Sequence, residues 1–267
     1  MDRFHSDGAE LVYEVSGSGP PVVLLHPFPG NRDFWKPVAP ALETRYRLIV
    51  PDLRGHGDSG TDDGPATMEK HARDLDRLLD AADLGKASFV GVSIGGYILF
   101  EFWRRFRNRV AALVLCDTRP QSDSAEASAN RLKVASDVLE KGTGEFIESM
   151  LPKLLGRSTL AARPDLVDGA RRMMQKMSPQ GINAVQRGMA ERPDSVADLK
   201  TINVPTLIAI GDEDVLSPPA DGELMRQHIS ASQLKLIPKA GHWSPWEQPD
   251  GAATLLRQFL DANRSVY

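Results

Sequence analysis

The sequence predicts an α/β protein with a mostly parallel central sheet flanked by helices. Short apolar segments alternate with longer segments whose apolar residues recur at helical spacing, which is typical of β-α-β units. Several of the short segments are apolar throughout, as expected for strands that helices cover on both faces. The chain has 267 residues, of which 41% are hydrophobic and 25% charged, so it can build a large core.

The apolar segments are the predicted strands. Residues 11–15 come before a turn rich in serine, glycine and proline, and we expect them to form an edge strand. The other predicted strands are 22–26, 48–50, 89–91, Val110–Cys116, 206–210 and 234–237. Helices are predicted at residues 68–82, 95–106, 220–229 and Pro249–Ala262.

The alternation of strands and helices stops between residues 118 and 200. Helical segments are predicted there near residues 125–141, 144–155, 165–177 and 179–190, without a strand. We therefore expect residues 1–117 and 201–267 to form the core and residues 118–200 to form a helical cap inserted into it. The insertion carries five of the eight methionines, which either line an adaptable apolar pocket or only pack the helices.

Charge and composition argue against several classes of partner. The net charge is −4 and basic residues are interspersed with acidic ones, so no nucleic-acid partner is expected. The N-terminus lacks the apolar segment of a signal peptide, and no apolar stretch is long enough to span a bilayer, so no membrane partner is expected. Cys116 is the only cysteine, which favours a cytoplasmic location. The sequence leaves the oligomeric state open.

No metal and no cofactor is expected. The six histidines show no His-x-x-x-His spacing, and there is no cluster of cysteines that could ligate a metal.

Residues 91–95 (GVSIG) fit the Gly-x-Ser-x-Gly pattern of a nucleophile elbow centred on Ser93. In such an elbow a serine lies on a sharp turn between a strand and a helix, and small residues two positions away avoid a clash. A strand is predicted before this segment and a helix after it. We therefore expect Ser93 to be the nucleophile.

A serine nucleophile needs a base, and the base needs a partner that orients it. Asp214 follows the predicted strand 206–210, and His242 follows the predicted strand 234–237, so both lie where open α/β folds bind ligands. Asp212 and Glu213 lie in the same loop, so position alone leaves three candidates for the acid. His242 is favoured as the base. His56 lies in a turn-like loop and is predicted to brace it.

Three further motifs carry a resemblance to a known family. They are residues 51–59 (PDLRGHGDS), 211–214 (GDED) and 240–249 (AGHWSPWEQP). Together with the elbow, and in the chain order Ser93, Asp214, His242, they resemble the α/β-hydrolase superfamily over nearly the whole chain. The resemblance implies the α/β-hydrolase fold with its cap after strand 6. It also implies that the acid is the fourth residue of the 211–214 motif, which favours Asp214 over Asp212 and leaves Glu213 as the least favoured. It is nearest in pattern to small bacterial esterases, enol-lactonases and cofactor-free haloperoxidases.

The resemblance also implies an oxyanion hole formed by two backbone N–H groups. One would come from Ile94, which directly follows the serine. Most relatives have His-Gly where this chain has His26 and Pro27, and proline has no N–H to donate. In relatives whose loop reads His-Gly-Phe-Pro the donor is the residue that follows this position, so the resemblance assigns the second donor to Phe28, which keeps its N–H. His26 is predicted to brace this loop.

We expect a serine hydrolase that cleaves small carboxylic esters or lactones through an acyl-enzyme on Ser93. A carbon–carbon bond hydrolase, a hydroxynitrile lyase or a perhydrolase with haloperoxidase activity would keep the same three residues. A non-enzymatic receptor for a small ligand is a further alternative. Dehalogenases and epoxide hydrolases of this superfamily need a carboxylate where this chain has Ser93.

No motif identifies the residues that form the wall of the substrate pocket. The candidates are Phe28, Trp35, Ile94, Trp243, Met150, Met173 and Met177. Trp35 and Trp243 fit the hydrophobic core equally well. Arg119, Arg131 and Arg187 are available to face a carboxylate on the substrate, as an enol-lactonase would need.

Overall fold

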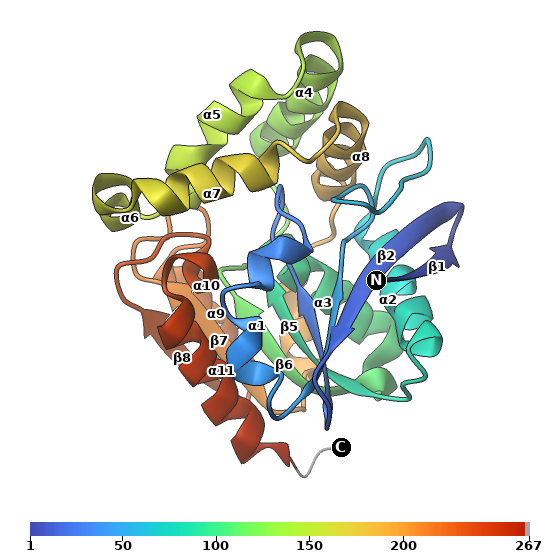
Figure 1. Cartoon of the computed structure of the whole chain (residues 1–267), viewed down its shortest axis with the longest axis vertical. Helices are drawn as coiled ribbons and strands as arrows, with labels where there is room; N and C mark the ends of the chain where they lie inside the picture. Colours follow the sequence, from blue (N-terminus) through green and yellow to red (C-terminus); the bar gives the residue numbers. More distant parts are fainter. Residues whose placement is uncertain (265–267) are drawn as a thin grey trace.

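The computed structural model describes residues 1–264. One eight-stranded sheet runs through these residues in the order β1-β2-β4-β3-β5-β6-β7-β8, with β1 and β2 antiparallel to their neighbours and the other strands parallel (Figure 1). The strands are β1 (Asp2–Ser6), β2 (Ala9–Ser16), β3 (Pro21–Leu25), β4 (Arg47–Pro51), β5 (Ala87–Val92), β6 (Val110–Cys116), β7 (Thr206–Gly211) and β8 (Ser232–Ile237).

The seven predicted strands are all present, but the predicted edge strand is wrong. Strand β2 pairs with β4 on one side and with β1 on the other, so the edge strand is β1. A tight turn at Asp7 and Gly8, both with positive φ, joins β1 to β2. Because β1 is short, mostly polar and mostly exposed, its sequence has no apolar run that would mark it as a strand.

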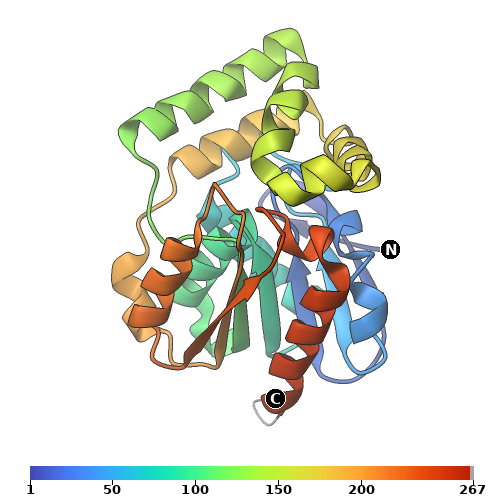
Figure 2. The ribbon, with the colours of Figure 1, turned by 90° about the vertical axis from the view of Figure 1, so that its left-hand side faces the viewer.

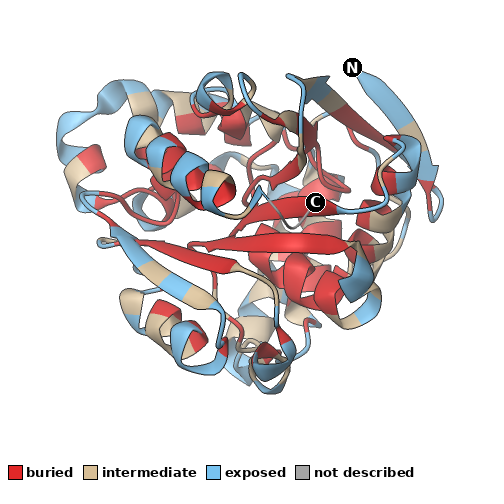
Figure 3. Cartoon of the chain, turned by 90° about the horizontal axis from the view of Figure 1, so that it is seen from below, coloured by how far each residue is buried: buried red, intermediate tan, exposed pale blue. Residues whose placement is uncertain are grey.

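Helices cover both faces of the sheet. Helix α1 packs with α11, α2 packs with α3, α3 contacts β5 and β6, and α9 contacts β7 and β8. Figure 3 shows the buried strands between these layers of helices. The core helices are α1 (Ala39–Leu42), α2 (Met68–Ala81), α3 (Ile94–Phe106), α9 (Pro219–His228), α10 (Ser244–Glu247) and α11 (Pro249–Ala262).

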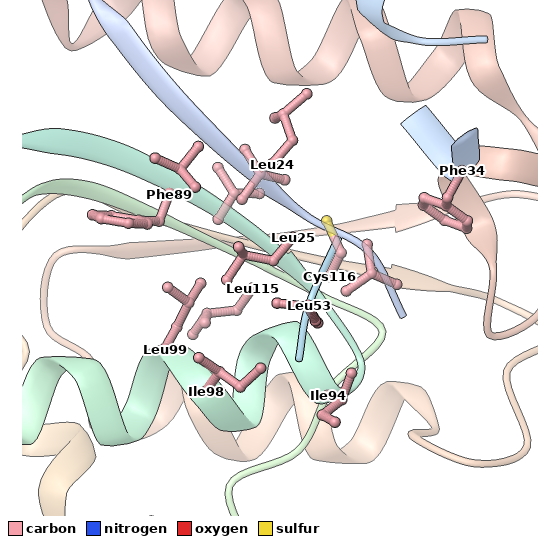
Figure 4. Close-up of a cluster of buried hydrophobic side chains, with 14 of the residues drawn as sticks. Leu24, Leu25, Phe34, Leu53, Phe89, Ile94, Ile98, Leu99, Leu115 and Cys116 are labelled. Carbon is pink, nitrogen blue, oxygen red and sulfur yellow. The ribbon is translucent and has the colours of Figure 1, made fainter. Parts of the chain in front are cut away.

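Buried aliphatic and aromatic side chains hold the central strands in register. Strands β5, β6 and β7 are buried along their whole length, as their uninterrupted apolar sequences predict. Figure 4 shows part of this core, where Leu25 of β3, Phe89 of β5 and Leu115 of β6 lie over Ile98 and Leu99 of α3. Because β3 to β8 are parallel, their carboxyl ends meet at one edge of the sheet, where the loops gather.

Five helices follow β6 and lie together above this edge (Figures 1 and 2). They are α4 (Ala125–Lys141), α5 (Gly144–Leu154), α6 (Arg157–Ala162), α7 (Pro164–Met174) and α8 (Pro179–Ala190), and we call them the cap helices. No strand lies within residues 118–200, all of which the structure describes. The sequence missed α6, which at six residues is too short to show a periodic pattern.

Within residues 1–264, no helix is long and apolar enough to cross a membrane.

Three buried histidines lie side by side near the loops that follow β3 and β4. The rings of His26 and His56 meet edge to face with centroids 4.9 Å apart. The His26 Nε2 atom accepts the Leu53 N–H at 3.0 Å, so the ring proton is on Nδ1, which donates to the Pro27 carbonyl. His26 therefore braces this loop, as predicted. Neither ring nitrogen of His71 has a hydrogen-bond partner within the described residues.

Burial lowers the pKa of all three imidazoles, to about 4 for His26 and well below 6.5 for His56 and His71. In the unfolded chain these groups take up a proton near pH 6.5, whereas the folded protein resists protonation. Their contribution to the free energy of unfolding is therefore complete above pH 6.5 and is lost as the pH falls below 6.5 toward the lowered pKa of each folded imidazole.

We expect His71→Leu to weaken this loss of stability in acid. The variant removes one group that takes up a proton on unfolding once the pH falls below 6.5, so the slope of the unfolding free energy against pH falls there by up to about 1.4 kcal/mol per pH unit. Urea unfolding at a series of pH values measures this slope. His5→Leu is the matched control, because the His5 side chain is 81% exposed. An unchanged slope in His71→Leu would contradict the assignment.

Candidate active site

Ser93 lies on the turn between β5 and α3, in the strained backbone conformation of a nucleophile elbow. Its φ and ψ are 55° and −112°, a region that non-glycine residues rarely adopt. The Ser93 N–H donates to the Cys116 carbonyl at 3.0 Å, and the Thr118 hydroxyl donates to the Ser93 carbonyl at 2.8 Å. These two bonds to the end of β6 hold the turn in place.

Close packing explains the glycines around Ser93. A Cβ atom on Gly91 would lie 2.6 Å from the backbone carbonyl carbon of Gly95. A Cβ atom on Gly96 would lie 2.3 Å from the Thr118 hydroxyl. The turn is therefore tight enough that a larger residue at either position would force the backbone apart.

Three residues that are far apart in the sequence form a chain of hydrogen bonds at the carboxyl edge of the sheet. The His242 Nε2 atom lies 2.7 Å from the Ser93 hydroxyl, and the His242 Nδ1 atom lies 2.8 Å from Asp214 Oδ2. Because a carboxylate only accepts, Nδ1 carries the ring proton and Nε2 is free to accept the proton of Ser93. All three side chains are buried, and the low local dielectric strengthens these hydrogen bonds.

Asp214 is the acidic residue of its loop that reaches His242. Its Oδ1 atom accepts the N–H groups of Leu216 and Ser217 at 2.8 and 3.0 Å, which fixes the carboxylate and leaves Oδ2 for the imidazole. The two alternatives are engaged elsewhere. Asp212 accepts the Lys239 N–H at 2.7 Å, and Glu213 accepts the hydroxyl of Ser158 on cap helix α6 at 2.5 Å.

Two buried carboxylates that sequence reasoning missed support this arrangement. Asp117, at the end of β6, accepts the Gly211 N–H at 2.8 Å and the Ser244 hydroxyl at 2.6 Å. It thus ties the strand that precedes Asp214 to the loop that carries His242. Burial, followed by the nearby charge of Asp214, raises the pKa of Asp117 well above its ordinary value. The sequence signal for Asp117 was its position directly after the predicted strand Val110–Cys116, at the edge of the sheet where ligands bind.

Glu247 is the second of these carboxylates. It accepts the Gly241 N–H with one oxygen and the Gly156 N–H with the other, both at 2.8 Å. Gly241 precedes His242, and Gly156 lies between cap helices α5 and α6. One side chain therefore fixes the histidine loop and joins it to the cap. Burial raises the pKa of Glu247 above its ordinary value.

The two backbone groups assigned to the oxyanion hole come from the serine turn and from the loop after β3. Ile94 is the first residue of α3, and an N–H in the first turn of a helix has no acceptor within the helix. Phe28 lies in the loop after β3 and lines the same cavity as Ser93. That loop is closed by a hydrogen bond of 2.8 Å from the Gly30 N–H to the Pro27 carbonyl. The roles of Phe28 and Ile94 as donors stay predictions.

A cavity of about 380 Å³ opens beside Ser93 and His242, between the sheet edge and the cap helices. Phe28 and Phe146 form part of its apolar wall, with ring centroids 5.8 Å apart. Met150 lines the cavity, as predicted, and so does Met189. The other described lining residues are Tyr97, Arg119, Asp123, Ala127, Asn130, Arg131, Val134, Ser149, Lys153, Leu154, Gln186 and Leu216.

The rest of the predicted pocket wall is corrected by the structure. Trp35 and Trp243 belong to the core, where both pack edge to face against Phe34 at 5.2 and 5.5 Å. Met173 and Met177 are buried in the hydrophobic core and do not line the cavity. The Ile94 side chain lies in the buried cluster with Ile98 (Figure 4). Packing between distant segments decides each of these positions.

Comparison with known proteins places this arrangement in a family. A family model described as the alpha/beta hydrolase fold matches residues 20–249. The chain belongs to the α/β-hydrolase family. Its mostly parallel eight-stranded sheet between helices is the fold of that family.

Proteins named esterase or enol-lactonase are similar to nearly the whole chain. A thermophilic esterase from Thermogutta terrifontis, in a structure with malate bound, is 41% identical with a TM-score of 0.95, and the match covers 100% of this chain and 99% of the esterase. The enol-lactonase from Burkholderia xenovorans LB400 is 25% identical with a TM-score of 0.91, covering 97% and 100% of the two chains. The 3-oxoadipate enol-lactonase 1 of Acinetobacter baylyi is 27% identical over 97% of this chain and 98% of the relative.

Proposed function

We propose that this α/β hydrolase is a serine hydrolase that cleaves small carboxylic esters or lactones through an acyl-enzyme on Ser93. The observation that carries the proposal is the chain of hydrogen bonds from Ser93 through His242 to Asp214, beside a cavity of about 380 Å³. The relatives named esterase and enol-lactonase support the hydrolysis of an ester or a lactone.

In the first half of the reaction, His242 Nε2 takes the proton of the Ser93 hydroxyl as its oxygen attacks the carbonyl carbon of the substrate. Asp214 holds the imidazole in the tautomer that can accept this proton and stabilises the imidazolium that forms. The carbonyl oxygen gains negative charge, which the N–H groups of Ile94 and Phe28 stabilise. The imidazolium then protonates the leaving alcohol, and the acyl group remains on Ser93.

In the second half, water replaces the alcohol. His242 removes a proton from the water as it attacks the acyl-enzyme, and then returns a proton to the Ser93 oxygen as the acid leaves. In a lactone the leaving alcohol and the acyl group belong to one molecule, so the product is a hydroxy acid. His242 therefore acts as base and then as acid in each half of the reaction, so one imidazole serves both proton transfers.

A panel of p-nitrophenyl esters from acetyl to octanoyl, together with several lactones, tests the proposed reaction. We expect kcat/KM to be highest for short acyl chains, because a cavity of about 380 Å³ is at the small end of ligand pockets. A maximum at the longest chains would contradict the short-chain preference. Absence of turnover on every ester and lactone would contradict the ester and lactone assignment and leave the carbon–carbon hydrolase and receptor alternatives.

A further inference from the structure

The cavity beside Ser93 is lined by more positive than negative charge, although the whole chain carries a net charge of −4. Among its described lining residues, three side chains are cationic, namely Arg119, Arg131 and Lys153. Asp123 is the one acidic residue of this lining. Three positive charges and one negative charge leave an excess of two positive charges at the place where a substrate has to bind.

Asp123 does not neutralise the arginines around it. Its side chain is 1% exposed and forms ion pairs with Arg131, with Arg119 at 3.3 Å and with Arg192 at 2.7 Å. Burial raises the pKa of this carboxyl, but the bonds and charges of Arg131 and Arg192 outweigh burial and lower it below its ordinary value. One ionised carboxylate is therefore shared by three guanidinium groups.

Arg192 is held away from the cavity, whereas the other two arginines border it. The Arg192 guanidinium lies over the Tyr97 ring, 4.3 Å from its centroid, and its side chain is 3% exposed. The side chains of Arg119 and Arg131 are 31% and 22% exposed, and both line the cavity. These two guanidinium groups are thus the accessible part of the cluster.

Hydrogen bonds fix the position of the two accessible arginines without using all their donors. Arg131 donates to Asp123 through Nε and to the side-chain oxygen of Gln186 at 3.2 Å through Nη1. Arg119 donates to Asp123 through Nη2 at 3.3 Å, and its buried Nε has no partner within the described residues. Arg119 follows β6 and Arg131 lies on α4, so the pair spans the boundary between the core and the cap helices.

We propose that Arg119 and Arg131 bind a carboxylate of the substrate, so that the preferred esters are half-esters of short dicarboxylic acids. A planar guanidinium matches the two oxygens of a carboxylate, and the partly buried site keeps the attraction stronger than it would be in bulk water. The ester carbonyl would lie at Ser93 and the free carboxylate at the two arginines. This inference rests on the proposed ester hydrolysis.

Monomethyl succinate and methyl succinamate are the matched substrates, because they differ only in a terminal carboxylate or amide. We expect the wild type to hydrolyse the anionic ester with at least tenfold higher kcat/KM, mainly through a lower KM. A charge-assisted hydrogen bond is roughly twice as strong as a neutral one, and this difference in free energy corresponds to about tenfold in binding. Release of protons at constant pH measures both rates. The preference should shrink as salt is added, because salt screens partly exposed charges.

Arg131→Gln and Arg119→Gln should each lower the ratio of the two kcat/KM values by about tenfold. Each ratio compares two substrates on one protein, so a general loss of active protein does not alter it. Arg187→Gln is the matched control, because Arg187 lies on cap helix α8 and is outside the cavity lining. It should keep the wild-type ratio.

The outcomes separate this inference from the proposed function. Hydrolysis of both esters with a ratio near one, unchanged in both variants, would overturn the carboxylate site and leave the ester hydrolase standing. If neither ester is hydrolysed, titration calorimetry of monomethyl succinate with the Ser93→Ala protein still tests the site. Binding that weakens about tenfold on addition of Arg131→Gln supports the site, and binding that does not change overturns it.

Discussion

Ester hydrolysis is lost when Ser93 is replaced by alanine. We expect kcat for p-nitrophenyl acetate to fall by about a million-fold, because the hydroxyl that forms the acyl-enzyme is gone and His242 has nothing to activate. A small rate above that of buffer should persist, since binding and the Ile94 and Phe28 N–H groups still favour attack by water. Steady-state rates of the purified variant, with circular dichroism and thermal unfolding to verify the fold, give the comparison.

Ser128→Ala is the matched control for this loss. Ser128 lies on cap helix α4, where its hydroxyl bonds to the Ala190 carbonyl at 3.1 Å, and it does not line the cavity. The control should retain wild-type turnover. If Ser93→Ala is folded and retains more than about a hundredth of the wild-type rate, Ser93 is not the nucleophile.

Replacing Asp214 with asparagine should lower kcat by about 10⁴-fold with little change in KM. An asparagine side chain can still accept the N–H groups of Leu216 and Ser217, so the loop keeps its shape. Its amide N–H₂, however, donates toward His242 Nδ1 and favours the tautomer with the proton on Nε2. That tautomer cannot accept the proton of Ser93.

Asp212→Asn tests whether the loss is specific to position 214. Asp212 lies two residues away and accepts the Lys239 N–H, so its substitution should leave turnover at the wild-type level. The same progress curves on p-nitrophenyl acetate serve for both variants. A large loss in Asp212→Asn together with normal turnover in Asp214→Asn would reverse the assignment of the acid.

Local sequence patterns were sufficient to predict most of the fold. The buried parallel strands are continuous apolar runs, and the long helices have a clear period, so both kinds of element were found within a few residues of their ends. Strand β1 was missed because its pairing with β2 depends on backbone hydrogen bonds and a tight turn, while its side chains are mostly exposed. Apolar periodicity carries no information about such a strand.

Prediction of the site was strongest where the backbone demands particular residues. The elbow at Ser93 requires small neighbours, and the strand ends at one sheet edge bring the acid loop and His242 together. Position therefore pointed to Ser93 and His242, whereas the choice of Asp214 within its loop came from the resemblance to the family motif. The supporting roles of Asp117 and Glu247 were missed because they depend on which segments the fold brings beside each carboxylate. Asp117 bonds to Gly211 of β7 and to Ser244, and Glu247 bonds to Gly156 in the cap as well as to Gly241.

The pocket wall was predicted least well, because tertiary packing decides which way each side chain faces. Trp243 directly follows His242, yet its ring is buried against Phe34 on the core side of the loop. Met150 and Met173 both lie on cap helices, but only Met150 faces the cavity. The arginines that border the cavity were named as candidates, and their shared partner Asp123 was not.

Covalent labelling of Ser93 by a fluorophosphonate is the most direct test of the proposed nucleophile. Such a reagent phosphonylates a serine hydroxyl only when a neighbouring base activates it. We expect the wild-type protein to gain the mass of one phosphonyl group on the peptide that contains Ser93, and the Ser93→Ala protein to gain none. An unlabelled wild type, or a label carried by another residue, would contradict the account.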